Sequence, residues 1–136
     1  MIPENVQHQI QQSLGTDIQS SQGVSGGSIN QAAKVTLSDS TNCFLKWNTS
    51  ADPAMFEVEE KGLQLLQSAG TALRIPEVLL TGKTVDGTGF LLQEFITEGS
   101  SNPDSAQQFG EALAALHNQH DQQYGLDHNN FIGRLP

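Results

Sequence analysis

The segment Cys43-Phe44-Leu45-Lys46-Trp47 is the most informative part of the sequence, because it places a lysine inside an otherwise apolar strand. Side chains alternate between the two faces of a strand, so Phe44 and Lys46 share one face while Cys43, Leu45 and Trp47 share the other. An ammonium group on a covered face is costly unless a carboxylate meets it. The segment therefore predicts an acidic partner for Lys46, unless the strand lies at a sheet edge where the lysine reaches water.

The following helix supplies a candidate partner. Asp52-Pro53 predicts the N-cap and first residue of a helix that ends at Gly70. On a helical wheel, an apolar arc of about 100° has Glu59 near its centre, and it is formed by Met55, Phe56, Leu63 and Leu66. A glutamate in a frayed turn is the alternative interpretation. Pairing Lys46 with Glu59 accounts for both misplaced charges at once.

A glycine-rich turn, Gly23-Val24-Ser25-Gly26-Gly27-Ser28, precedes the lysine strand. Glycines let the backbone approach a ligand closely, and serine hydroxyls can bond to phosphate oxygens. An ordinary hairpin turn fits this segment equally well. It is not a Walker A loop, because no Gly-Lys-Ser/Thr follows, and it is not a dinucleotide fingerprint, because no helix begins there.

The remaining pattern predicts an α+β chain with the order helix, three strands, helix, two strands, helix. The first helix has apolar residues at every fourth position from Ile2 to Leu14, with Pro3 as its first residue and Gly15 at its end. The expected strands are 17–24, 29–37, 42–48, 76–80 and 89–96. The last helix runs to about His120, with the apolar stripe Phe109, Leu113, Leu116 and His120, and Ala112 alongside.

A glycine-rich hairpin, a strand lysine, a helix glutamate and an apolar strand ending in Glu94-Phe95-Ile96 together resemble the amino-terminal lobe of a protein-kinase-like fold. The chain is similar to the fructosamine/ketosamine-3-kinase family, whose relatives are the aminoglycoside phosphotransferases. Six stretches in family order carry the resemblance: 24–30, 44–48, 55–59, 75–78, 109–117 (Phe109-Gly110 and Ala114-Ala115-Leu116-His117) and 125–133.

The resemblance implies an antiparallel sheet of about five strands with a C-type helix, followed by the first helix of the carboxy-terminal lobe. It implies an ATP-holding lobe at 1–97, and at 98–136 a linker, that helix and a tail.

The resemblance also implies roles for single residues. Residues 24–30, including Ser25, Gly26, Gly27 and Ser28, would cover the phosphates. Lys46 would hold the α- and β-phosphates, with Glu59 orienting it. Gln93 would be the gatekeeper, the Glu94 carbonyl and Ile96 amide would read the adenine edge, and Phe44 would help roof the adenine.

One departure from the family pattern is Ser28, where many members have cysteine. A thiol-based redox switch in that loop is therefore not expected. Cys43, the single cysteine, is expected to be a buried strand thiol.

The function implied is ATP- and magnesium-dependent phosphorylation of the sugar 3-hydroxyl of ketosamines (fructosamine or ribulosamine) on glycated amines or proteins, so that deglycation can follow. In this family a His-Gly-Asp segment, a nearby Asn and a later Asp supply the base and metal ligands from the carboxy-terminal lobe. No His-Gly-Asp occurs before the chain stops at Arg134-Leu135-Pro136, so we expect this polypeptide alone to be inactive. The alternatives are an aminoglycoside-type or other small-metabolite phosphotransferase, and a non-catalytic nucleotide-binding or scaffold domain.

The charge and composition exclude several partners. Fifteen acids against six scattered bases give a net charge of −9, which disfavours nucleic acid. No apolar stretch could span a bilayer, no signal peptide is evident, and one cysteine suits a reducing compartment, so we expect a cytoplasmic protein.

His117, His120 and Asp121 have a possible metal spacing, but histidines favour helix carboxyl ends for dipole reasons and no metal is assigned. The last helix is expected to expose Phe109, Leu113 and Leu116, which favours self-association or helix repacking.

Overall fold

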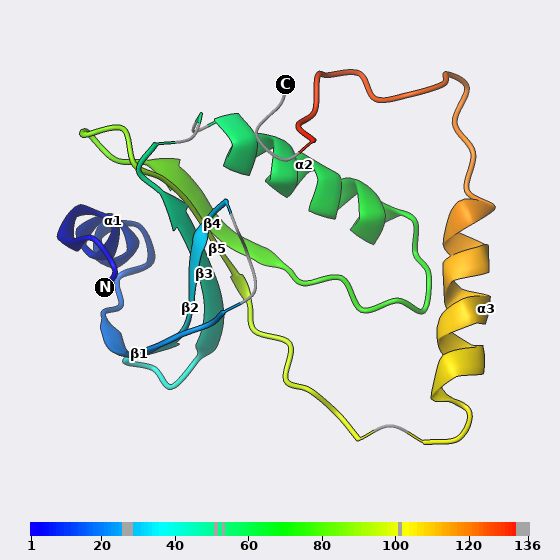
Figure 1. The fold of residues 1–136 in the computed structure, drawn as a ribbon, viewed down its shortest axis with the longest axis horizontal. Helices are drawn as coiled ribbons and strands as arrows, with labels where there is room; N and C mark the ends of the chain where they lie inside the picture. Colours follow the sequence, from blue (N-terminus) through cyan, green and yellow to red (C-terminus); the bar gives the residue numbers. More distant parts are fainter. Residues whose placement is uncertain (26–28, 51, 53, 101, 133–136) are drawn as a thin grey trace.

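A computed structural model describes residues 1–25, 29–50, 52, 54–100 and 102–132. Figure 1 shows two helices on opposite sides of one sheet and a third helix standing apart. The elements are α1 (Glu4–Leu14), β1 (Ile18–Gly23), β2 (Gln31–Leu37), β3 (Asn42–Asn48), α2 (Ala54–Ser68), β4 (Val78–Lys83), β5 (Gly89–Glu94) and α3 (Ser105–His117). This order is the predicted one, and the α+β class with a five-stranded sheet is confirmed.

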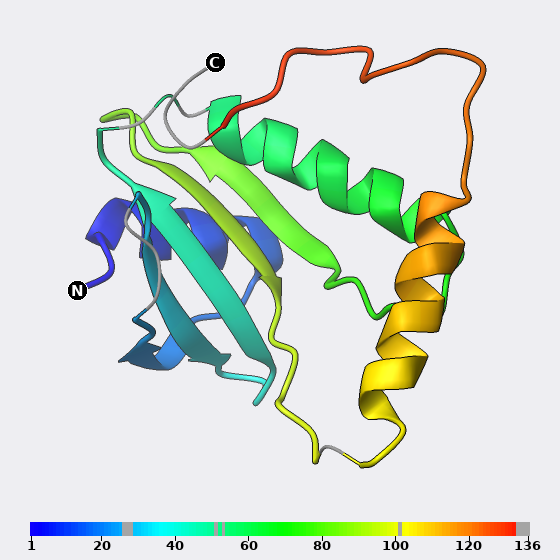
Figure 2. The same cartoon turned by 45° about the vertical axis from the view of Figure 1, so that its right-hand side comes forward.

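The sheet is antiparallel throughout, with the strand order β1-β2-β3-β5-β4 (Figure 2). β3 is its central strand, and Lys46 lies in register with Ala32 on β2 and Leu91 on β5. The edge-strand alternative for Lys46 is therefore excluded.

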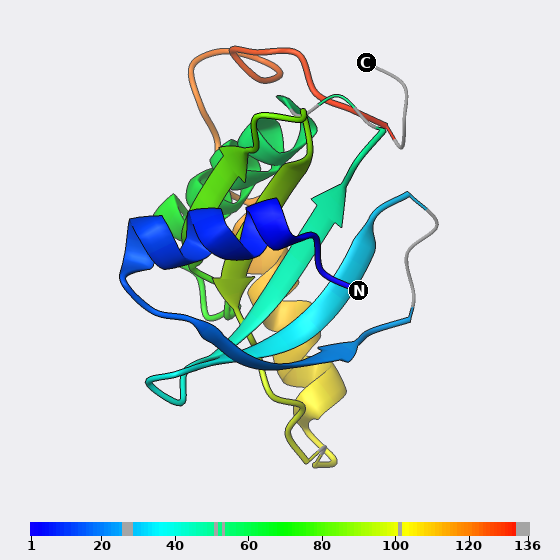
Figure 3. The ribbon, with the colours of Figure 1, turned by 90° about the vertical axis from the view of Figure 1, so that its left-hand side faces the viewer.

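The face of the sheet that α1 covers holds the main apolar core (Figure 3). Val6 and Ile10 of α1 are fully buried against Val35, Leu45 and other apolar strand residues. Cys43, Leu45 and Trp47 all belong to this core, as their alternation predicted. α1 ends at Gly15, whose left-handed φ of 67° is costly for other residues. Pro3 is the N-cap rather than the first helical residue, because its ψ of 139° is not helical.

The opposite face of the sheet is covered by α2 (Figure 1). The Asp52 carboxylate accepts the Ala54 backbone N–H at 3.0 Å, as expected of an N-cap side chain. Phe56 is fully buried, but Leu66, predicted to face the core, is 37% exposed. Leu66 lines an open groove with Leu63 and Phe131, so this end of the apolar arc is only partly covered.

α3 makes little contact with the sheet. Phe109 is 59% exposed, Leu113 and Leu116 are half-buried, and only Ala112 of this helix is buried, so the expected exposure of the apolar stripe is confirmed. The helix ends at His117, and His120, predicted as part of the stripe, lies beyond it and is exposed. Within the described part of the chain, no helix has the length and apolar character needed to cross a membrane.

The buried thiol of Cys43 predicts a pH dependence of stability. Burial, and to a lesser extent the Asp39 charge, raises the pKa of the Cys43 thiol above its usual 9.0. The folded chain therefore holds this proton more tightly than the unfolded chain, and the resulting stability is present below the usual pKa and lost as pH rises through the folded-state pKa. Urea unfolding between about pH 8 and about pH 11 should show a steeper loss of stability in the wild type than in Cys43→Ala. Parallel pH profiles would contradict this.

Candidate functional site

The Lys46 ammonium and the Glu59 carboxylate form an ion pair between β3 and α2. Both side chains are partly buried, with exposed fractions of 26% and 29%. Glu59 lies inside α2 rather than at a frayed end, so that alternative is excluded. The Lys46 Nζ also lies 5.8 Å from the centroid of the Phe44 ring, on the same strand face. The pairing predicted from the sequence is therefore present, and it holds the Lys46 ammonium on the face of the sheet that α2 covers.

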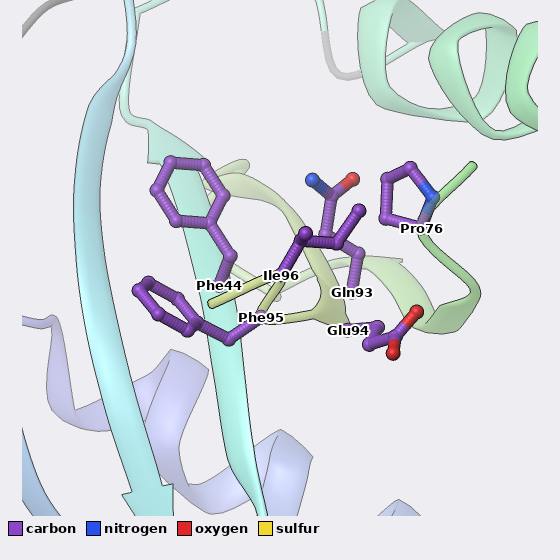
Figure 4. Close-up of a pocket in the computed structure, with 6 residues that line it drawn as sticks. All are labelled: Phe44, Pro76, Gln93, Glu94, Phe95 and Ile96. Atoms are coloured by element: carbon purple, nitrogen blue, oxygen red, sulfur yellow. The ribbon is translucent and has the colours of Figure 1, made fainter. Parts of the chain in front are cut away.

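A cavity of about 270 Å³ lies at the end of β5, beside this face (Figure 4). It is lined by Phe44, Pro76, Gln93, Glu94, Phe95 and Ile96. Four of these residues, Phe44, Gln93, Glu94 and Ile96, are predicted site residues, and the structure brings them together. Pro76 and Phe95 were not predicted to line a site, although both lie in stretches with clear strand or turn character.

The backbone at residues 94–96, here called the hinge, has a defined orientation. The Phe95 N–H bonds to the Asn42 carbonyl of β3 at 3.3 Å, whereas the Glu94 N–H bonds to the Glu77 carbonyl at 2.8 Å. The Glu94 carbonyl and the Phe95 N–H belong to one trans peptide group and point in opposite directions, so the Glu94 carbonyl faces away from β3. The Glu94 carboxylate forms an ion pair with Arg74.

Asn48, which was not among the predicted site residues, anchors the exit of the glycine-rich turn. Its buried side chain donates to the Ile29 carbonyl at 2.6 Å and to the Asn30 side-chain oxygen at 2.9 Å. Its own oxygen accepts the Ser50 backbone N–H at 2.8 Å. The sequence feature that could have identified Asn48 is a polar residue at the end of an otherwise buried strand.

Ser25 is exposed, and the predicted residues Gly26, Gly27 and Ser28 lie outside the described residues.

The segment 124–132, here called the tail, runs back to α2 (Figure 1). Asn130 and Phe131 line a groove of about 410 Å³ together with Ile29 and, on α2, Glu59 and its apolar neighbours. The pKa of the Asp127 carboxyl is lowered, first by its hydrogen bond to His128 and then by the charges of His128 and, least, of Lys61 on α2. The tail therefore lies along the face of α2 that presents Glu59.

No group of three or more His, Cys, Asp or Glu side chains within the described ranges is close enough together to hold a metal ion. His117, His120 and Asp121 do not form such a group either. The described residues thus supply a cation for anionic ligands but do not fit a magnesium site.

The Asn48 anchor can be tested by substitution. Asn48→Ala removes two donors and leaves the Ile29 carbonyl without its partner, so the free energy of unfolding should fall by about 1–3 kcal/mol. Urea unfolding measures the change, with Thr49→Ala, an exposed neighbour, as the matched control. Equal stability of the two variants would show that Asn48 does not hold the turn.

Comparison with known proteins identifies the family. A family model described as fructosamine kinase matches residues 2–136. A "Probable ketoamine kinase" of Lactiplantibacillus plantarum is 38% identical over 121 residues, covering 89% of this chain and 40% of that protein. A "Protein-ribulosamine 3-kinase, chloroplastic" of Arabidopsis thaliana is 34% identical over 115 residues, covering 83% of this chain and 34% of that protein.

Among solved structures, a "putative fructosamine-3-kinase" of Haemophilus somnus matches with a TM-score of 0.79 and 25% identity, over 96% of this chain and 44% of that one. The chain thus spans less than half the length of the relatives it matches. The match over nearly all of its 136 residues agrees with the kinase-like sheet, helix and ion pair described above, and the chain belongs to the fructosamine kinase family.

Proposed function

We propose that this chain is the ATP-binding part of a kinase that phosphorylates the sugar 3-hydroxyl of ketosamines, fructosamine or ribulosamine, on glycated amines or proteins. The observation that carries the proposal is the partly buried ion pair of Lys46 and Glu59. It lies next to the cavity of about 270 Å³ at the end of β5, here called the hinge cavity. Lys46 contacts the α- and β-phosphates, and Glu59 fixes the position of its ammonium group. The turn at 24–30, including Ser25, Gly26, Gly27 and Ser28, covers the phosphates.

The hinge cavity takes the adenine. Phe44 offers an aromatic face on one side, and the Glu94 backbone is turned away from β3 towards Pro76 and Glu77. The Glu94 carbonyl accepts a hydrogen of the adenine 6-amino group, and the Ile96 N–H donates to the adjacent ring nitrogen. The family assignment supports a nucleotide site in this chain, because the matching family model and relative are described as kinases.

The transfer step needs residues that these 136 do not contain. The sequence has no His-Gly-Asp segment, and the described residues hold no group of carboxylates suited to magnesium. Magnesium, when bound, neutralises charge on the phosphates. Residues 1–97 form the ATP-holding lobe and 98–136 the linker, first helix and tail of the second lobe. On its own, the chain binds nucleotide without transferring phosphate, and we place it in the cytoplasm.

The central test is ATP binding by the chain as it stands. Lys46→Ala should raise the Kd for ATP about tenfold or more, because it removes a charged contact to phosphate. Titration calorimetry measures the affinity, and thermal unfolding checks that the variant folds. Lys83→Ala is the matched control, since Lys83 is an exposed lysine at the end of β4. Equal ATP affinity of Lys46→Ala and the wild type would remove Lys46 from the site.

The substrate class requires a polypeptide that also carries the second lobe. ATP consumption should be seen with a fructosamine or ribulosamine and not with an aminoglycoside. Turnover of the aminoglycoside alone would favour the small-metabolite phosphotransferase. Nucleotide binding with no turnover of any sugar would favour the non-catalytic domain.

The exposed stripe on α3 should make the isolated chain self-associate. Phe109 is largely exposed and lines an open cavity of about 630 Å³ with Leu73 and Ala112, an apolar surface that a second copy would cover. Light scattering should show dimers whose fraction rises with concentration, and Phe109→Ser should shift them to monomers. Val85→Ser, at a fully exposed apolar position in the turn between β4 and β5, is the control. Monomers at every concentration would refute the pairing.

A further inference from the structure

Gln93 carries a buried hydrogen-bond acceptor with no partner. In the described part of the chain, four buried side-chain polar atoms have no hydrogen-bond partner: Thr71 Oγ1, Thr81 Oγ1, Gln93 Oε1 and His128 Nε2. Gln93 is the one of these residues that lines the hinge cavity. An unpaired buried oxygen lowers stability, and proteins retain such groups chiefly where a ligand or water supplies the missing donor.

The Gln93 side chain lines the inner wall of the cavity, and its Oε1 is covered by neighbouring protein atoms. Gln93 lies in register with Phe44 on β3 and with Val78 on β4, so its side chain leaves the sheet on the same face as Lys46 and Phe44. Figure 4 shows its carboxamide projecting between the Phe44 ring and Pro76. The next residue, Glu94, begins the hinge.

The chemistry of a 6-aminopurine matches this arrangement. Its exocyclic amine carries two hydrogens, and the proposed hinge contact to the Glu94 carbonyl uses one of them. The second hydrogen points away from the hinge backbone, towards the inner wall. A 6-oxopurine has no such hydrogen, and its ring N–H would meet the Ile96 N–H, donor against donor.

We propose that Gln93 is a base-selecting residue, whose Oε1 accepts the second hydrogen of the purine 6-amino group. The inference rests on the proposed ATP site and goes beyond it, because it assigns the selection of the base to a side chain. Gln93 thereby adds to the backbone contacts of the hinge, which alone recognise only one of the two amine hydrogens.

The test compares two ligands in two proteins. ATP and purine riboside triphosphate, which lacks the 6-amino group, are titrated calorimetrically into the wild type and Gln93→Met, which keeps the length of the side chain and removes the acceptor. The wild type should bind ATP more tightly than purine riboside triphosphate. In Gln93→Met, the Kd for purine riboside triphosphate divided by the Kd for ATP should fall about tenfold, because ATP binds more weakly while purine riboside triphosphate binds as before. Gln22→Met, an exposed glutamine on β1, is the matched control and should leave the ratio unchanged.

The outcomes separate this inference from the site itself. An unchanged Kd ratio in Gln93→Met, with ATP still bound, overturns the role of Gln93 and leaves the ATP site standing. Absence of ATP binding by the wild type overturns both. If Gln93→Met does not fold, the side-chain amide resonance of Gln93 in the wild type decides: it should shift with ATP and not with purine riboside triphosphate, and equal shifts refute the proposal.

Discussion

The ion pair of Lys46 and Glu59 is the interaction on which the rest of this structure depends, because it joins the central strand to the helix that covers it. Removing one partner would leave the other charge partly buried and uncompensated, which costs more than the pair contributes. The two faces of the sheet also differ in the groups that they carry. The α1 face is a dry apolar core, and the α2 face keeps a cation, an aromatic ring and an unpaired amide oxygen.

Segments outside the regular sheet are held by polar side chains rather than by apolar burial. Asn48 fixes the exit of the glycine-rich turn to the end of β3, and Arg74 holds the start of the hinge through Glu94. These contacts prepare the backbone groups proposed to meet phosphate and base before any ligand arrives, which lowers the entropic cost of binding. The unpaired oxygen of Gln93 has the opposite effect, since it reduces the stability of the free protein in favour of a ligand.

The helices of this fructosamine kinase family member differ in how well the sheet covers them. The sheet with α1 and α2 has a covered core on each face, whereas α3 leaves Phe109 exposed. The chain spans less than half the length of its relatives. The described residues place the Lys46 ammonium beside the cavity at the end of β5.

The sequence by itself determined the class and order of the elements and the two faces of β3. It also determined the partner of Lys46, because the Lys46 ammonium and the Glu59 carboxylate each lie on an apolar face of their own element and each requires an opposite charge there. Only the tertiary structure decided that β5 lies between β3 and β4, that Leu66 faces a groove, that α3 ends before His120, and that Asn48 and Pro76 belong to the site. The physical reason is that periodicity reports which side of an element is covered but not by which neighbour. The neighbour depends on long-range packing that no local pattern records.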